Sequence, residues 1–172
     1  VSREQIDQAR ITEAKTALIE GLRTGALPVG SVVRGTSITE LQEIVHTGRL
    51  VEGQNAEGTP SIAATYLSEE GFPLYGKSGI GLIAFPGQYK DSGFAHEAWI
   101  DKTTKPRNLQ FFVGGRILSF DELSDALDTI EKPMFARVKP AQPSWAVEPP
   151  GKLDAIIRKL QDKNIDIKRV VE

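Results

Sequence analysis

The chain contains no cysteine and only two histidines, His46 and His96, among its 172 residues. The absence of cysteine excludes disulfide bonds and cysteine-ligated zinc, and two histidines are too few for a histidine-rich metal site. Hydrophobic stretches are short, so no segment has the length that a membrane-spanning helix needs. We therefore expect neither a resident metal nor a membrane partner.

Charge of one sign is not in excess either, because 21 lysines and arginines face 23 aspartates and glutamates. This near-neutral balance provides no global field that attracts nucleic acid or a lipid surface, so any affinity for RNA would have to be local. What the chain does have is enough length to bury a stable core in one domain.

Hydrophobic periodicity predicts several helices separated by short strands. Helices are expected at 2–24, 39–45, 62–70, 121–130 and 152–162, and strands at 31–34, 80–85, 94–100 and 109–113. Thr39 is the expected N-cap of the second helix. The chain then divides into an N-terminal helix (1–27), an α+β core (28–131), and a proline-rich arm with a C-terminal helix (132–172).

The most informative stretch is Val32-Val33-Arg34-Gly35-Thr36-Ser37, in which an arginine ends a β-branched strand just before a helix. A second helix start is expected after Thr59-Pro60-Ser61. Helix N-termini present free N–H groups and a favourable dipole end, so two of them near Arg34 would form a cleft suited to phosphates. The alternatives are an ion-pair role for Arg34 and ordinary helix capping by the hydroxyls.

These residues resemble the mono-ADP-ribosyltransferase toxins, whose first motif is apolar-apolar-Arg-Gly on a strand and whose second is a Ser/Thr-rich turn before a helix. The resemblance implies an α+β fold with a split, mostly antiparallel sheet and flanking helices, and NAD as the cofactor. The residues that it implies for cofactor binding are Arg34, Gly35, Thr36, Thr59, Ser61 and Tyr66. Tyr66 would stack on nicotinamide, or else belong to the core.

The third motif of that family is a glutamate on a late strand, usually two residues after Glu or Gln and followed by apolar residues ending in glycine. The segment Asn108-Leu109-Gln110-Phe111-Phe112-Val113-Gly114 matches this setting, with Gln110 at the position of the catalytic glutamate. An amide can hydrogen-bond a ribose hydroxyl but brings no charge to an oxocarbenium-like state. Gln110 would then be a natural departure or a disarmed form of the enzyme, and Gln110→Glu would create activity.

The rival catalytic carboxylate is Glu97, which lies in the segment Phe94-Ala95-His96-Glu97-Ala98-Trp99-Ile100. Its neighbours are mostly apolar and a strand is expected there, so an inward-facing charge would need a purpose. If the side chain faces solvent, Glu97 is an ordinary strand surface residue. With Glu97 catalytic, the alignment of Gln110 to the third motif is out of register.

The loop just before the third motif often recognises the target in this family. Here the corresponding residues are Lys102, Lys105, Arg107 and Asn108. Their basic side chains would approach an acidic protein surface or a phosphate backbone. The alternative is a solubilising hairpin tip.

Other enzyme classes match less of the sequence. Gly71-Phe72-Pro73-Leu74-Tyr75-Gly76-Lys77-Ser78 satisfies the P-loop pattern, but a working P-loop joins a strand to a helix, whereas here a helix is expected before it and a strand after it. A serine hydrolase would need a Gly-x-Ser-x-Gly elbow, which is absent. An RNA phosphotransferase would need basic residues that converge on one phosphate.

The resemblance therefore implies transfer of ADP-ribose from NAD to a macromolecular acceptor, either protein or RNA. It further implies a secreted or injected toxin or effector that acts in the cytoplasm of a target cell, with a cognate immunity protein, or otherwise a cytoplasmic enzyme. The alternatives are an NAD glycohydrolase and a non-catalytic binding or scaffold domain, which the glutamine at position 110 favours.

Overall fold

The computed structural model describes residues 2–54, 60–76, 78–128 and 152–162. In chain order its elements are α1 (Arg3–Thr24), β1 (Val32–Gly35), α2 (Ile38–Thr47), β2 (Gly53–Gln54), β3 (Pro60–Ser61), β4 (Ala63–Tyr66), β5 (Ile80–Ala84), β6 (Tyr89–Asp91), β7 (Glu97–Ile100), the 3-10 helix η1 (Pro106–Asn108), β8 (Gln110–Val113), β9 (Arg116–Leu118), α3 (Phe120–Leu127) and α4 (Lys152–Asp162).

Seven of the strands form one sheet in the order β6-β7-β4-β1-β5-β8-β9, and every neighbouring pair is antiparallel. The short strands β2 and β3 pair separately. The expected α+β class and the mostly antiparallel sheet are therefore confirmed.

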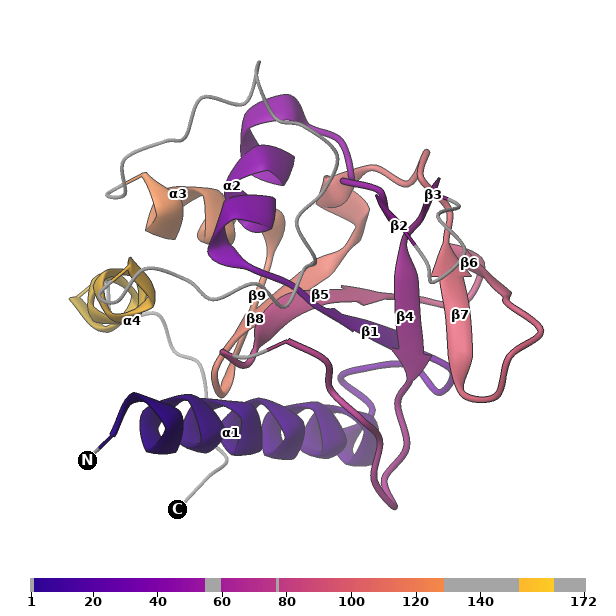
Figure 1. The fold of residues 1–172 in the computed structure, drawn as a ribbon, viewed down its shortest axis with the longest axis horizontal. Helices are drawn as coiled ribbons and strands as arrows, with labels where there is room; N and C mark the ends of the chain where they lie inside the picture. Colours follow the sequence, from indigo (N-terminus) through magenta and orange to yellow (C-terminus); the bar gives the residue numbers. More distant parts are fainter. Residues whose placement is uncertain (1, 55–59, 77, 129–151, 163–172) are drawn as a thin grey trace.

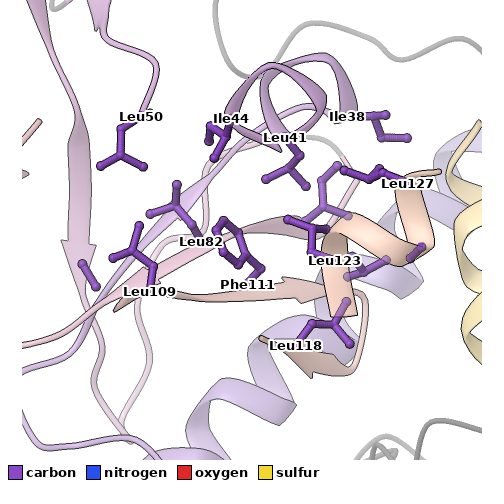
Figure 2. Packing of buried hydrophobic residues seen from close by; sticks show 14 of the residues in the cluster. Ile38, Leu41, Ile44, Leu50, Leu82, Leu109, Phe111, Leu118, Leu123 and Leu127 are labelled. Atoms are coloured by element: carbon purple, nitrogen blue, oxygen red, sulfur yellow. The ribbon is translucent and has the colours of Figure 1, made fainter. Parts of the chain in front are cut away.

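Helices cover the two faces of this sheet (Figure 1). Because side chains alternate along a strand, Val32 and Val33 of β1 point to opposite faces. Val32 joins the larger buried cluster, which includes residues of α2, α3 and α4, and Figure 2 shows Leu41 and Leu123 packed there around Phe111 of β8. Val33 joins a smaller cluster with Leu18 of α1. The central strands are thus buried on both faces.

The helix ends follow local capping chemistry. Ser2 and Ser119 each form a capping box, and Gly25 and Gly48 take the left-handed conformation that closes α1 and α2. The N-cap of α2 is Ser37, not the predicted Thr39, because the Ser37 hydroxyl accepts a hydrogen bond from the N–H of Glu40. The predicted helices at 2–24 and 152–162 are confirmed.

The helix predicted at 62–70 is wrong, because Ala63–Tyr66 is the strand β4, paired with β1 on one side and β7 on the other. Non-local pairing decides the conformation of this small-residue segment, against its local tendency. Ser61 consequently leads into a strand and not a helix, so the expected pair of converging helix N-termini does not form.

One strand begins later than expected, and two strands at the edges of the sheet were not predicted. The strand expected from position 94 begins at Glu97, because Gly93 and His96 both have positive φ angles in the preceding turn. The short strands β6 and β9 were not predicted, and both lie at the edges of the sheet, where little hydrophobic alternation is required. The proline-rich arm lies outside the described residues.

Candidate functional site

Arg34 is a buried arginine at the end of β1, only 8% exposed. Its guanidinium forms a two-point ion pair with Glu40 of α2: Nε donates to Oε2 at 3.2 Å, and Nη2 donates to Oε1 at 3.2 Å. Both side chains are 9% exposed, so the pair is almost fully removed from water. The fork of the guanidinium matches the carboxylate, which gives the contact both direction and strength.

The same guanidinium bridges a split in the sheet. β1 and β4 are paired only at Val32↔Tyr66 and Val33↔Thr65, whereas β1 stays paired with β5 as far as Gly35. Where the ladder between β1 and β4 stops, Nη1 of Arg34 donates to the carbonyl oxygen of Ala63 at 3.1 Å. A side chain thus replaces the backbone pairing and satisfies a carbonyl at the opening.

This arrangement limits what Arg34 can offer to a ligand. Of its five N–H groups, Nε, one on Nη1 and one on Nη2 are used by Glu40 and Ala63, so two N–H groups have no partner among the described residues. Nη2 lies close to the backbone of Gly53, since a Cβ there would be 3.3 Å from it. The guanidinium is therefore a structural bridge first, with a small remaining capacity for a ligand.

A second polar cluster lies across β4, on strands β7 and β6. Nε1 of Trp99 donates to Oε2 of Glu97 at 3.1 Å, and the ammonium of Lys90 lies over the Trp99 ring, 5.6 Å from its centroid. Glu97 and Trp99 are half-buried and Lys90 is exposed. A carboxylate, an indole and a cation thus meet on the face of the sheet that α1 covers, opposite to the face from which the Arg34 side chain leaves β1.

Ala63 connects these two clusters. Its carbonyl oxygen receives the Arg34 hydrogen bond, and its Cα is paired with Trp99 on the other neighbouring strand. The order β7-β4-β1 therefore brings the arginine strand and the Glu97 strand against the same part of β4 (Figure 1). We take this split between β1 and β4, with its flanking residues, as the candidate site.

Gln110 lies far from this split. It begins β8 and is paired with Ile83 of β5, which is in turn paired with Val33 of β1. Continuing the row through Thr65 leads to Glu97, so four strand spacings, about 19 Å, separate the two residues. The two candidate catalytic positions cannot both act on one ribose.

The remaining cofactor-binding candidates divide between the split and the core. The backbone of Tyr75 packs directly against Gly35, since an added Cβ at Gly35 would lie 1.4 Å from the Tyr75 carbonyl oxygen. Thr36 is buried, and its N–H donates to the carbonyl oxygen of Ile80. Ser61 on β3 pairs with Gly53 beside Arg34, and Thr59 lies outside the described residues.

Tyr66 does not face the Trp99 cluster. It follows Thr65 on β4, so it points to the opposite face, where its ring makes an edge contact with Tyr89 at 5.6 Å between centroids. Burial, together with the nearby charge of Asp91, raises the pKa of the Tyr66 phenol. Its placement on a strand, and not on the predicted helix, explains why it belongs to this core contact.

The two ends of the predicted recognition loop contact different parts of the protein. Lys102 pairs with Glu52 at 3.7 Å, and Glu52 precedes Gly53, so this end lies beside the split. Arg107 instead bonds Asp121 at 2.9 Å and lies over the Phe120 ring of α3. Lys105 and Asn108 are exposed, and the Asn108 carbonyl accepts a hydrogen bond from Gln88.

The P-loop alternative lacks the expected structural context. Its preceding element is the strand β4, not the predicted helix, but Ser78 is buried and leads into the strand β5. The strand-to-helix turn that would hold phosphates on a helix N-terminus is therefore not formed at Ser78, and Lys77 lies outside the described residues.

Sequence reasoning did not identify three of the residues that build the site: Glu40, Trp99 and Lys90. Glu40 had a visible signal, because an acid in the first turn of a helix that directly follows an arginine-ended strand is within reach of that arginine. Lys90 and Trp99 had none, since their contact depends on the pairing of β6 with β7.

The described part of the chain shows neither a metal-binding group nor a membrane-spanning helix. No group of three or more His, Asp or Glu side chains there could hold a metal ion. No helix there is long and apolar enough to cross a membrane. No protein-family model, curated protein or solved structure matches this chain, so its function is argued from the geometry of these residues.

Proposed function

We propose that the chain transfers ADP-ribose from NAD to a macromolecular acceptor, either protein or RNA, with Glu97 as the catalytic carboxylate. One observation carries the proposal: Ala63 accepts a hydrogen bond from Arg34 and is paired with Trp99, whose indole binds Glu97. The strand that carries the arginine and the strand that carries the carboxylate of the resemblance thus adjoin one residue of β4, and the Arg34 and Glu97 side chains leave opposite faces of the sheet there.

The chemistry explains why a carboxylate is required at this place. The bond between ribose C1′ and the nicotinamide nitrogen breaks, and its electron pair leaves with nicotinamide. A lone pair of the acceptor then forms the new bond to C1′, and the acceptor loses its proton. Positive charge develops on the ribose ring in between, and a fixed carboxylate such as Glu97 stabilises that charge and aligns a ribose hydroxyl.

The cationic groups for the diphosphate differ from those expected. Arg34 is largely occupied by Glu40, so we assign it the role of holding the edges of the split, with two N–H groups left for the ligand. Lys90 and Lys102 are exposed and both lie near Asp101, where their charges add to two hydrogen bonds from Thr103 in lowering its pKa. Because Lys90 lies over the Trp99 ring, we assign the mobile positive charge to Lys102.

Two observations favour a second function, a non-catalytic binding domain. The guanidinium of Arg34 is satisfied by internal partners, as in a structural ion pair. In addition, the position two residues before Glu97 is Ala95, where the family usually has Glu or Gln. A binding domain would need the split but not the charge of Glu97.

Release of nicotinamide from NAD and calorimetric titration with NAD test the proposal together. We expect the parent chain to bind and consume NAD, and Glu97→Gln to bind it but turn it over at least 100-fold more slowly. Glu70→Gln, an exposed carboxylate after β4, is the matched control and should be unchanged. Binding without turnover in the parent would favour the binding domain, and no binding would contradict both functions.

Turnover without an acceptor would identify the NAD glycohydrolase reaction at the same site. Labelled ADP-ribose on protein or on RNA from a cell lysate would distinguish the two acceptor classes. An effector of this kind would act in the cytoplasm of a target cell, and its producer would need an immunity protein that blocks the split.

A further inference from the structure

The contact between Trp99 and Glu97 fixes one side of the candidate catalytic carboxylate. The two residues are two apart on β7, so their side chains leave the same face of the sheet. The indole N–H donates to Oε2 at 3.1 Å. Among the described residues, no donor contacts the second oxygen, Oε1. One oxygen is held by the protein and the other is presented for a further partner.

The Trp99 ring is itself held in place. On the β6 side its register partner is Lys90, whose ammonium lies 5.6 Å from the ring centroid. A cation at this position is attracted to the face of the indole. On the β4 side the register partner is Ala63, whose methyl group is too small to cover the ring. The indole is therefore held from the Lys90 side, and its neighbour on the β4 side is a small residue.

We propose that Trp99 is the positioning residue for Glu97: its indole N–H fixes the rotation of the carboxylate so that Oε1 faces the ribose of NAD. Lys90 keeps the Trp99 ring in place through its contact with the ring face. The inference rests on the proposed function and adds to it. A freely rotating carboxylate would lose part of the preorganisation that makes electrostatic stabilisation effective, because it would have to be oriented during the reaction.

Replacing the donor while keeping an aromatic ring tests this role. Trp99→Phe should lower kcat for NAD hydrolysis about tenfold, because one charge-assisted hydrogen bond is lost, and should leave KM within about twofold. Lys90→Met keeps the aliphatic stem but not the charge, and it should lower kcat less. In the Glu97→Gln background, Trp99→Phe should cause little further loss, because the two residues act as a unit.

Fluorescence supplies a readout that does not depend on turnover. The chain has two tryptophans, so Trp145→Phe leaves Trp99 as the only indole. In that background Glu97→Gln should shift the Trp99 emission, whereas the control Glu70→Gln should not. A shift with Glu97→Gln establishes that the two side chains are in contact in solution.

The outcomes separate this inference from the proposed function. If NAD is hydrolysed but Trp99→Phe keeps the parent kcat, or if KM rises and kcat does not fall, the positioning role is overturned while the function stands. The positioning role is overturned as well if the Trp99 emission does not change in Glu97→Gln. If no NAD is consumed, the function fails and the inference fails with it, even where the emission shift is seen. If Trp99→Phe does not fold, Lys90→Met is used in its place. A lower kcat in that variant supports the positioning role, and an unchanged kcat overturns it.

Discussion

Gln110 and Glu97 lie at opposite ends of one row of paired residues that crosses the sheet. The row runs from Gln110 through Ile83, Val33 and Thr65 to Glu97, and its middle is buried beneath α1. The Glu97 end lies on β7, one strand away from the split that Arg34 bridges, and on the face opposite to the one from which the Arg34 side chain leaves. The geometry therefore favours a natural carboxylate at position 97 over a replaced one at position 110.

This relationship reverses the first expectation about Gln110→Glu. We expect that substitution to leave NAD turnover within about threefold of the parent, since the new charge would be about 19 Å from Glu97. Glu97→Gln should lower turnover by about 100- to 1000-fold, the usual cost of removing one transition-state-stabilising group. The rate of nicotinamide release measures both. A large gain from Gln110→Glu would instead place the catalytic centre on β8.

The buried ion pair between Arg34 and Glu40 predicts a large loss of stability when one partner is removed. Arg34→Met should lower the free energy of unfolding by about 3–5 kcal/mol, because Glu40 would keep an uncompensated charge out of water. Arg34→Lys should recover little of this loss, since an ammonium cannot form the two-point contact. Urea denaturation measures these values.

Removing both charges is the control for that prediction. The double variant Arg34→Met with Glu40→Met should regain much of the stability lost in the single variant, because no charge stays buried. Equal losses in the single and double variants would mean that the hydrogen bond to Ala63, and not the ion pair, dominates.

Gly35 predicts a steric requirement beside the split. A Cβ at this position would meet the Tyr75 carbonyl oxygen at 1.4 Å, so Gly35→Ala must displace backbone and should cost about 3 kcal/mol or more. Gly115→Ala is the matched control, because its Cβ would find ordinary contact at 3.6 Å from Glu13. Thermal unfolding of the two variants should differ clearly, and similar midpoints would contradict the close packing.

The glycine-lysine-serine stretch predicts no affinity for ATP. Ser78 leads into β5 and not into a helix, so the helix N-terminus that a P-loop uses is not formed there. Lys77→Ala should leave both stability and NAD binding within error, as for most loop substitutions. Calorimetric ATP binding that disappears in this variant would reverse the ranking of the two nucleotide sites.

Local signals predicted the parts of the fold that depend on local chemistry. The N-terminal helix followed from its apolar spacing and its closing glycine Gly25, and β5 followed from a continuous apolar run. β4 was mistaken for a helix, because Ala63 and Ala64 favour a helix locally and the two strands that neighbour β4 are distant in the sequence. Strand pairing of this kind is a tertiary decision.

The candidate site was predictable only in part, for the same reason. Arg34 stood out because an arginine at the end of a valine-rich strand is unusual. Its partners, however, are a helix residue and a carbonyl oxygen that the fold brings to it. The choice between Glu97 and Gln110 required the strand order, which no local pattern contains.

The last prediction concerns acid pH and the contact between α1 and α4. Arg10 and Arg3 both pair with Asp154, and the hydrogen bond from Arg10 is the main reason that the pKa of this carboxyl is lowered, with the charges of both arginines adding to it. A lowered pKa means that the unfolded chain binds more protons at this site than the folded chain. The stability that the Asp154 ion pair contributes is therefore present above the pKa of the unfolded chain, about 4. It is lost as the pH falls through the lower pKa of the folded chain.

Asp154→Asn should accordingly reduce stability at pH 7 and flatten its decline below about pH 4. The effect should be modest, because the Asp154 side chain is 39% exposed and solvent screens it. Amide exchange should rise first in α4, which packs through Leu153 and Ile156 in the larger cluster and is joined to α1 by this ion pair. Asp128→Asn, an exposed carboxyl at the end of α3, should keep the parent's acid limb. If the free energy of unfolding of Asp154→Asn declines below about pH 4 as steeply as that of the parent, other carboxyls and not this pair cause the loss of stability in acid.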